Sequence, residues 1–387
     1  MYKDIFLRIC KVYVKQYMDF AFIFDFDWEE QKRIWESDKI INVKIRDTEN
    51  VLKRIFTKWS LWLWESYCEW KIEVDDDEYR EFIFIFVRIT YNKKLLWKLR
   101  LLDIFRVLRA IYGRKYFSYW SQEADINSHY SLRNWFDNND DSNEFYLMWL
   151  NAKYIQYSCW KWDRWTRRLE EAQENKLNFY AKRLWIFKRS EWKTLLDLGC
   201  GWWWLIFYMA EKYSIKCTGL TLSVAQAKYI NEEIDRRWLR DLVNVEIRNI
   251  HNIQWKYDYI TSVGVMEHIT DYDDLYKKVS KSLKENWKTL IHSMFQETKK
   301  LIDADPFLLK YIFPGAGIPQ LKHNLEVFRK YFKYVDNNEL PDKSYPKTLQ
   351  CWFDNFCKNE KSIRRLLEEK SKVTDVDYAI RVYKHYL

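Results

Sequence analysis

The chain has 387 residues, of which 48% are hydrophobic and 31% are charged, and its formal net charge is +9. This length exceeds what one ordinary hydrophobic core supports and predicts two domains. The positive charge is mild. It excludes the basic stripe of a nucleic-acid-binding domain, so no nucleic-acid partner is expected, and it favours contact with an anionic membrane surface.

Cysteine usage and hydropathy narrow the class further. The seven cysteines are odd in number and show no C-x-x-C spacing, which argues against a disulfide framework or a zinc site, so no metal is expected. We interpret the chain as a reduced, cytosolic protein. It contains no run of 18 apolar residues without a charge, and no membrane span is expected.

The first part of the chain predicts a smaller α+β domain over residues 1–122. Residues 19–47 alternate as strands do, with a hairpin turn expected at Asp27 and Trp28. Residues 48–58 have helical spacing, an acidic helix start follows at 75–83, and 92–123 is basic and helical. The polar stretch over 123–143 is the expected linker.

From residue 144 to 387 the pattern changes to alternating strands and helices. Strands are expected at 194–200, 216–222, 243–249, 257–265 and 288–295. A helix is expected after the first strand and through Tyr213, and further helices at 224–237 and 272–284. This alternation predicts an α/β domain with a doubly wound, Rossmann-like sheet and right-handed crossovers. Ligands of such sheets bind beyond the carboxyl ends of the strands.

The sequence "DLGCG" closes the first of these strands. It places Asp197, Gly199 and Gly201 at a strand-to-helix turn. Glycines let the backbone approach a ligand closely, and a helix N-terminus offers free N–H groups. The spacing is G-x-G-x-x with Trp204 where a small residue is usual. On these residues alone, a ligand site and an ordinary tight turn both remain open.

Eight ordered motifs resolve this ambiguity through a resemblance. The chain contains "YSCWKW", "LEEAQ", "LDLGCGWWW", "GLTLSVAQ", "VGVMEH", "LIHSM", "KYIFPGAGIPQ" and "SYPKTLQCW". In this order they resemble the cyclopropane-fatty-acid synthase family of S-adenosylmethionine-dependent methyltransferases, which includes the mycolic-acid methyltransferases. The resemblance covers residues 140 to about 385 and extends weakly to "SLWLWESYCEW". It implies a class I methyltransferase sheet with helical lipid-binding insertions.

The resemblance implies a site for S-adenosylmethionine. Gly199 and Gly201 are expected to admit the methionine part of the cofactor, and Thr221 and Gln226 to lie near its ribose. At the position of Asn249 the family often has an acidic residue for adenine, and an amide can also hydrogen-bond there. The complete set of implied cofactor-binding residues is Tyr157, Ser158, Gly199, Gly201, Thr221, Gln226 and Asn249.

The resemblance also implies a substrate and a second ligand. The family's methyl acceptor is a cis alkene in an acyl chain of a membrane phospholipid. Methyl addition makes a carbocation, and a base must then remove a proton to close a cyclopropane ring. The family holds a bicarbonate ion as that base, and the matching ligands are Cys159, Glu267, His292 and Tyr345, with the backbone of Met294. We expect the four side chains to converge on one pocket beyond the strand ends.

Location and partners follow from the same resemblance. An unsaturated phospholipid is the expected partner, so the protein is expected to dock peripherally on the inner face of the membrane from the cytosol. A homodimer is a further candidate assembly. The chain stops at "RVYKHYL", where the family continues with another helix and strand, so a truncated sheet with an open edge is expected.

Other interpretations stay open. Singly, His292 fits a satisfied core histidine, Glu267 a charge at a helix start, and Cys159 a small core residue. A methyltransferase acting on a small amine or a phospholipid headgroup would not need His292 and Tyr345 near a carbonate-sized anion. A lipid-binding protein without catalytic activity is the third option.

Tryptophan usage raises a separate hypothesis. The 7 glycines and 22 tryptophans together make up about 7.5% of the chain, close to the roughly 7% that glycine alone occupies in an average protein. The family has glycine where this chain has Trp62, Trp64, Trp70, Trp203 and Trp204. Turn and helix-end patterns add Trp28, Trp238 and Trp287.

We therefore hypothesise that UGA codons meaning glycine in the source were read as tryptophan. Trp149, Trp202 and Trp352 match tryptophans of the family and are expected to be genuine. A lineage-specific gain of aromatic residues is the alternative. Near the "DLGCG" turn, an indole at position 203 or 204 is expected either to enter the cofactor pocket or to be pushed outward with local strain.

Overall fold

The computed structural model describes residues 2–17, 20–27, 30–58, 60–91, 135–136, 139–150, 155–188, 190–202, 204–297, 305–333 and 336–387. The chain forms two compact units. The first comprises residues 1–118, 305–311 and 377–386, and the second 119–304, 312–376 and 387. No helix in the described part is long and apolar enough to span a bilayer.

The first unit contains a four-stranded sheet. Its strands are β1 (Phe20–Phe26), β2 (Glu30–Ile34), β3 (Lys39–Ile45) and β4 (Ile72–Val74), in the order β2-β1-β3-β4. β1 runs parallel to β3, while β2 and β4 pair antiparallel. The helices are α1 (Tyr2–Tyr17), α2 (Thr48–Lys58), α3 (Ser60–Cys68) and α4 (Asp76–Tyr91). The buried Phe22, Phe24 and Phe26 show the period of two that the sequence predicted for β1.

Two helices from far along the chain complete this unit. They are α13 (Pro306–Tyr311) and α17 (Val376–Tyr386). The buried Glu65 of α3 accepts hydrogen bonds from Lys310 at 2.6 Å and from the Tyr311 hydroxyl at 2.8 Å. In α17, Nδ1 of His385 shares a 2.7 Å hydrogen bond with the hydroxyl of Tyr79. Both helices lie within residues 144–387, which the sequence predicts to be one separate domain, so their packing in the first unit differs from that prediction.

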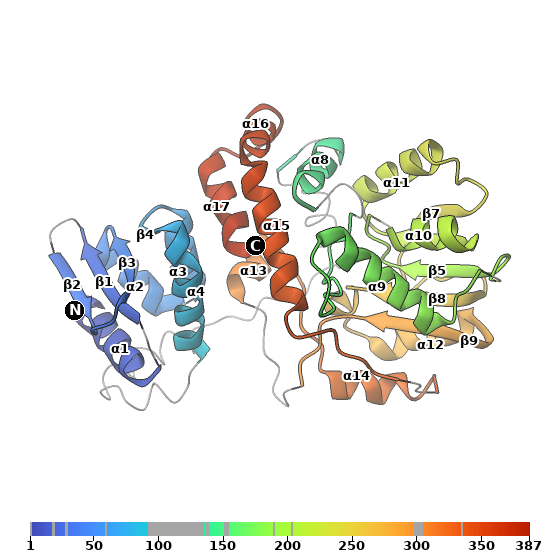
Figure 1. The fold of residues 1–387 in the computed structure, drawn as a ribbon, viewed down its shortest axis with the longest axis horizontal. Coiled ribbons are helices and arrows are strands. Elements are labelled where there is room, and N and C mark those ends of the chain that lie inside the picture. Colours follow the sequence, from blue (N-terminus) through green and yellow to red (C-terminus); the bar gives the residue numbers. More distant parts are fainter. Residues whose placement is uncertain are drawn as a thin grey trace. The chain divides into compact units, whose positions relative to one another are not determined.

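The second unit is built on a five-stranded parallel sheet (Figure 1). Its strands are β5 (Thr194–Leu198), β6 (Lys216–Thr221), β7 (Val243–Ile247), β8 (Tyr257–Val263) and β9 (Leu283–His292), in the order β7-β6-β5-β8-β9. Leu195, Leu196 and Ile260 of its central strands are buried, as expected where helices cover both faces. The predicted α/β, doubly wound fold class is confirmed.

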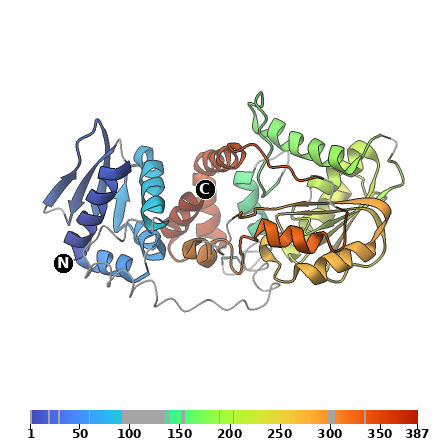
Figure 2. The ribbon, with the colours of Figure 1, turned by 90° about the horizontal axis from the view of Figure 1, so that it is seen from below.

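Helices lie on both faces of this sheet. Figure 2 shows α9 (Leu169–Leu184) on one face, and α12 (Tyr272–Ser282) with α14 (Leu321–Phe328) on the other. The crossover helices are α10 (Trp204–Tyr213), α11 (Val224–Arg236) and α12. Ser223 caps α11 by accepting the Gln226 N–H at 3.3 Å, and Asp271 caps α12 by accepting the Asp274 N–H at 2.9 Å.

Three more helices gather beside the carboxyl ends of the strands. They are α8 (Asn139–Leu150), α15 (Ser344–Lys358) and α16 (Glu360–Lys370). Asn143 of α8 donates to the carbonyl of Ala225 at 2.9 Å and accepts from the Trp202 indole N–H at 3.0 Å. This network ties α8 to the turn after β5 and to the start of α11.

The tryptophans divide into two groups by backbone conformation and exposure. Six described tryptophans have a left-handed backbone, with φ between 58° and 75°: Trp35, Trp70, Trp185, Trp192, Trp238 and Trp255. All six are exposed, up to 92% for Trp238. Five others are instead buried at 2% or less: Trp64, Trp149, Trp160, Trp202 and Trp352.

This division bears on the individual tryptophan predictions. The left-handed conformation expected at Trp238, one residue past the end of α11 and its cap, is confirmed. The prediction at Trp287 is wrong by one position, because Asn286 takes the positive φ of 65° and Trp287 continues β9. Trp28 and Trp203 lie outside the described residues. Trp62 and Trp64 lie in α3, which does not require glycine.

Candidate functional site

The turn after β5 leaves its backbone open toward a pocket. Gly199 and Gly201 have φ of 71° and 56°, which favours glycine. A Cβ atom added to Gly199 would lie 2.5 Å from Cγ2 of Val265, so this residue must be small. A Cβ atom added to Gly201 would meet nothing within 4 Å. The second glycine therefore borders open space, as a backbone that approaches a ligand should.

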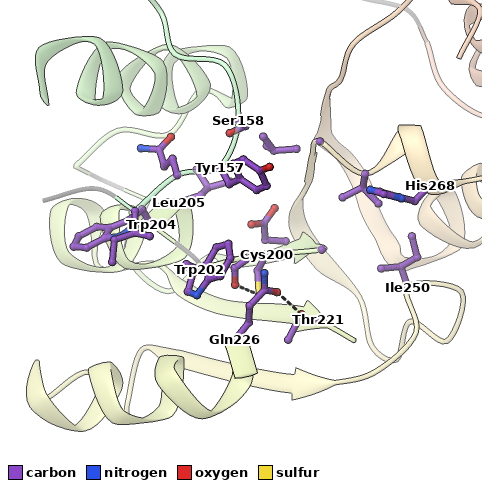
Figure 3. A pocket seen from close by; sticks show the side chains of 18 of the residues that line it. Tyr157, Ser158, Cys200, Trp202, Trp204, Leu205, Thr221, Gln226, Ile250 and His268 are labelled. Carbon is purple, nitrogen blue, oxygen red and sulfur yellow. Dashed lines mark hydrogen bonds between the residues drawn. The ribbon is translucent and has the colours of Figure 1, made fainter. Parts of the chain in front are cut away.

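One pocket collects all seven residues expected to bind the cofactor. Its lining includes Tyr157, Ser158, Gly199, Gly201, Thr221, Gln226 and Asn249 (Figure 3). They come from the segment before α9 and from the carboxyl ends of β5, β6 and β7. The tertiary structure therefore brings these distant positions to the edge where parallel sheets bind ligands.

Within the pocket, Gln226 has a hydrogen-bonding group to offer. The Thr221 hydroxyl donates to Gln226 Oε1 at 2.8 Å, which orients the amide (Figure 3). The buried Nε2 atom of Gln226 then has no hydrogen-bond partner among the described residues. An unsatisfied buried donor is costly unless a ligand supplies an acceptor. The pocket therefore fits a polar ligand at this point.

Asp197 adds a buried carboxyl to the same pocket. It accepts a 2.7 Å hydrogen bond from the Thr261 hydroxyl. Burial raises its pKa to about 7. The sequence analysis noted Asp197 at the turn but did not include it among the site residues. A carboxyl here can accept hydrogen bonds from a ligand's ammonium group.

The four residues expected to hold bicarbonate lie outside this lining and form a neighbouring, half-buried cluster. Tyr345, at the start of α15, is electrostatically coupled to Cys159 and Glu267. Glu267 Oε1 accepts the backbone N–H of Met294 at 2.8 Å, where the resemblance implied a backbone contribution. His292 ends β9, and its Nδ1 shares a hydrogen bond with the hydroxyl of Tyr180.

Backbone contacts explain why α15 reaches this cluster. The N–H of Trp160 donates to the Thr348 hydroxyl, and the N–H of Trp162 donates to the Ser344 hydroxyl, each at 3.2 Å. These bonds hold the first turn of α15 against the segment that carries Cys159. The sequence alone gave no sign of this pairing, which joins positions more than 180 residues apart.

Burial sets the protonation states in the cluster. It lowers the pKa of His292 to about 3, with a smaller contribution from the charge of Lys176, so the imidazole is neutral at pH 7. Burial raises the pKa of Cys159 to about 11 and that of Tyr345 to about 12, so both keep their protons. Burial also raises the pKa of Glu267. The cluster therefore offers S–H and O–H donors beside one carboxyl.

Lys176 and Tyr180 of α9 join the pocket to the cluster, and the sequence analysis missed both. They line the cofactor pocket. Lys176 Nζ donates to the Ser158 hydroxyl at 2.8 Å and is electrostatically coupled to Cys159 and His292. Their spacing of four residues was the available signal, because residues four apart share a face when the segment is helical.

The two tryptophans of the turn that the structure describes have different environments. Trp202 is buried, and its indole N–H is hydrogen-bonded to Asn143, as expected for a genuine tryptophan. Trp204 is also buried and lines the pocket, with the Arg237 guanidinium 4.5 Å from the centre of its ring.

Comparison with known proteins agrees with this geometry. A family model described as mycolic acid cyclopropane synthetase matches residues 122–387. The cyclopropane-fatty-acyl-phospholipid synthase of Escherichia coli strain K12 is 29% identical over 205 residues, covering 52% of this chain and 51% of that protein. Cyclopropane mycolic acid synthase 2 of Mycobacterium leprae is 31% identical over 237 residues, covering 55% of this chain and 76% of that protein.

A solved structure shares the fold. The cyclopropane synthase MmaA2 from Mycobacterium tuberculosis matches with a TM-score of 0.59 and 23% identity, covering 69% of this chain and 91% of that chain. The match to the E. coli relative spans about half of that protein's length.

Proposed function

Since the chain belongs to the mycolic acid cyclopropane synthetase family, we propose that it is an S-adenosylmethionine-dependent methyltransferase that forms cyclopropane rings on unsaturated phospholipid acyl chains. Bicarbonate serves as the proton acceptor. One observation supports the proposal: a glycine-turn pocket at the strand ends lies next to a half-buried cluster of donor groups, and Lys176 and Tyr180 connect the two.

The pocket residues fit the cofactor. S-adenosylmethionine, when bound, supplies an electrophilic methyl group on a sulfonium centre. Gly201 leaves room for it beside the backbone, the free Nε2 of Gln226 can donate to it, and the Asp197 carboxyl can accept from its ammonium group. A cofactor held by these groups would present its sulfonium next to the cluster, where proximity would lower the barrier for a weakly nucleophilic alkene.

The cluster residues fit bicarbonate, which has both acceptor oxygens and one O–H. The protonated Cys159 and Tyr345 can donate to it. The buried Oε2 of Glu267 has no hydrogen-bond partner among the described residues and can accept the O–H of the ion. Bicarbonate, when bound, supplies a base. His292 is a poor substitute, because burial lowers its pKa to about 3.

The surrounding aromatic side chains suit the reaction. Methyl transfer to a cis alkene gives a carbocation, and loss of one proton closes the ring. The rings of Trp149 and Trp352 each lie 5.4 Å from that of Tyr157, which lines the pocket. Aromatic faces attract cations, and a buried site excludes the water that would trap the carbocation.

The proposed substrate lies in a membrane, so the enzyme is proposed to act peripherally from the cytosolic side. The net charge of +9 supports attraction to anionic lipid headgroups. Binding to vesicles is therefore expected to strengthen with anionic lipid and to weaken with salt.

The test is incubation of the protein with dioleoyl-phosphatidylglycerol vesicles and methyl-labelled S-adenosylmethionine. Mass spectrometry of the released fatty acids should show a label-bearing chain one methylene heavier, with a cyclopropane ring. Removing bicarbonate should slow the reaction. Glu267→Gln should lower the rate on the order of 100-fold and leave S-adenosylhomocysteine binding unchanged, because Glu267 lies outside the pocket lining.

Label in the headgroup would contradict the acyl-chain assignment and favour headgroup methylation. Vesicle binding without any methyl transfer would favour a non-catalytic lipid-binding protein. A rate that does not depend on the bicarbonate concentration would be consistent with a methyltransferase but would contradict bicarbonate as the base.

A further inference from the structure

Lys176 occupies the boundary between the cofactor pocket and the cluster. It lies on α9, one turn before Tyr180, and is 1% exposed. Its Nζ atom donates to the Ser158 hydroxyl at 2.8 Å. It also acts electrostatically on Cys159 and His292. A single ammonium group therefore faces both the pocket and the cluster.

Within the described part of the chain, this ammonium forms no ion pair with a carboxylate. Cys159 is the one titratable group among the described residues that raises the pKa of Lys176. That thiol stays protonated at neutral pH because burial raises its pKa to about 11. Burial accordingly lowers the pKa of Lys176 to about 7. Burial of an ammonium group without a nearby anion costs free energy of folding. Binding of an anion next to Lys176 would therefore stabilise the site.

The ammonium group of Lys176 has N–H donors that its hydrogen bond to Ser158 does not use. A lysine ammonium carries three N–H donors, and the hydrogen bond to Ser158 uses one. A planar oxyanion beside it would accept a second donor and neutralise the charge. The sulfonium proposed for this pocket makes an anion more necessary, because two uncompensated cations would repel each other.

We propose that Lys176 binds a carboxylate-class oxyanion at this junction. Two sources supply that chemistry: the carboxylate of the cofactor's methionine part and bicarbonate. The inference rests on the proposed function, because both anions belong to the same site. It adds a binding and charge-balancing residue that none of the motifs indicated.

The experiment compares Lys176→Met with Lys182→Met, an exposed lysine on the same helix. Isothermal titration uses three probes: S-adenosylhomocysteine, which has the carboxylate; 5′-methylthioadenosine, which lacks it; and bicarbonate. Lys176→Met should weaken S-adenosylhomocysteine or bicarbonate on the order of 10- to 100-fold. It should leave 5′-methylthioadenosine unchanged, and Lys182→Met should match the parent with all three probes.

Two further readouts separate binding from folding. The anion should raise the pKa of Lys176, so the parent should take up roughly half a proton on binding at pH 7, since its pKa is about 7 when unbound. Lys176→Met should take up none. Its melting temperature should equal or exceed that of the parent, because an uncompensated buried charge is gone.

The outcomes distinguish the sources and the proposals. Loss confined to S-adenosylhomocysteine assigns the cofactor carboxylate, and loss confined to bicarbonate assigns that ion. The inference is overturned if Lys176→Met binds S-adenosylhomocysteine and bicarbonate as tightly as the parent does. It is also overturned if the parent binds neither of them. The titrations contain no lipid. Failure of the vesicle assay alone would therefore reject the proposed substrate without contradicting anion binding by Lys176.

The left-handed tryptophans carry a second, independent inference. A left-handed backbone is costly for a bulky residue and free of cost for glycine. Trp238 follows the cap of α11, where glycine is the usual residue, and it is 92% exposed. Its indole therefore gains little packing to offset the strain. The same combination of positive φ and exposure recurs at Trp35, Trp70, Trp185, Trp192 and Trp255.

We infer that these six positions are glycine in the natural protein, whereas the buried Trp149, Trp160, Trp202 and Trp352 are genuine. Sequencing the gene and measuring peptide masses from the source cells test this. The six left-handed positions should read UGA and yield glycine. Trp149, Trp160, Trp202 and Trp352 should read UGG and yield tryptophan. A UGG codon or a tryptophan mass at any of the six would overturn the assignment there.

Discussion

The hydroxyl of Tyr180 and Nδ1 of His292 share a hydrogen bond between α9 and the end of β9. Since His292 is neutral, this bond selects which ring nitrogen carries the proton and directs Nε2 elsewhere. Tyr180 is therefore a positioning residue for His292.

Tyr180→Phe should remove this orientation. We expect kcat to fall about tenfold, with KM for the cofactor nearly unchanged, and the free energy of unfolding to fall by about 1 kcal/mol. Steady-state kinetics and urea denaturation measure both. Tyr331→Phe is the matched control, because its hydroxyl bonds Asp273 at 2.8 Å on an exposed part of α12. Equal kinetic losses in the two variants would contradict a positioning role.

The buried carboxyl of Asp197 should make stability depend on pH. Its pKa of about 7 exceeds the value of roughly 3.9 in an unfolded chain. Between these values the folded state binds more protons, so this residue lowers stability as pH rises from 4 to 7. Asp197→Asn should therefore gain stability over the parent with rising pH, by a few kcal/mol at pH 8. Urea denaturation across this range measures the difference.

Asp258 provides a control of opposite sign. Although burial opposes it, hydrogen bonds from Lys284 and Thr194 lower the pKa of Asp258. Asp258 therefore stabilises the folded state at pH values above its pKa in the unfolded chain. This stabilisation is lost as the pH falls through its lower pKa in the folded state. Asp258→Asn should thus be less stable than the parent at pH 7, with the difference shrinking in acid. The same slope in both variants would rule out the assigned pKa for Asp197.

The two glycines of the β5 turn should respond differently to alanine. Both have positive φ, which costs about 1–2 kcal/mol for alanine. Gly199→Ala adds a contact of 2.5 Å with Val265, so its loss of stability should exceed that of Gly201→Ala by on the order of 1–3 kcal/mol. Gly201→Ala should chiefly weaken S-adenosylhomocysteine, because its methyl group borders open pocket. Thermal melts and titration calorimetry separate the two effects.

Substitution of tryptophan by glycine should raise the free energy of unfolding at the left-handed, exposed tryptophans and lower it at the buried ones. Trp238→Gly should raise the free energy of unfolding by about 1 kcal/mol, because it relieves a left-handed backbone at an exposed site. Trp202→Gly should lower it by about 3–5 kcal/mol, because it empties a buried, hydrogen-bonded site. Denaturation curves measure both. A loss of stability in Trp238→Gly would count against the strain argument.

Features that depend on neighbouring residues could be predicted from the amino-acid sequence. Alternation along β1 and the strand–helix succession from β5 to β9 predict the two kinds of domain, because side-chain periodicity follows backbone geometry. The "DLGCG" turn places the cofactor pocket, since glycine marks close backbone approach. The helix-end pattern also located the left-handed Trp238 correctly.

The tertiary structure alone decided what depends on distant contacts. No local pattern indicates that α13 and α17 pack with the first unit, or that Thr348 and Ser344 hold α15 against the segment of Cys159. The role of Lys176 has the same origin. An ammonium on a helix face resembles any surface lysine until packing removes water from it and leaves it without a carboxylate. Burial and partner choice are properties of the folded chain, because they depend on residues that the sequence places far apart.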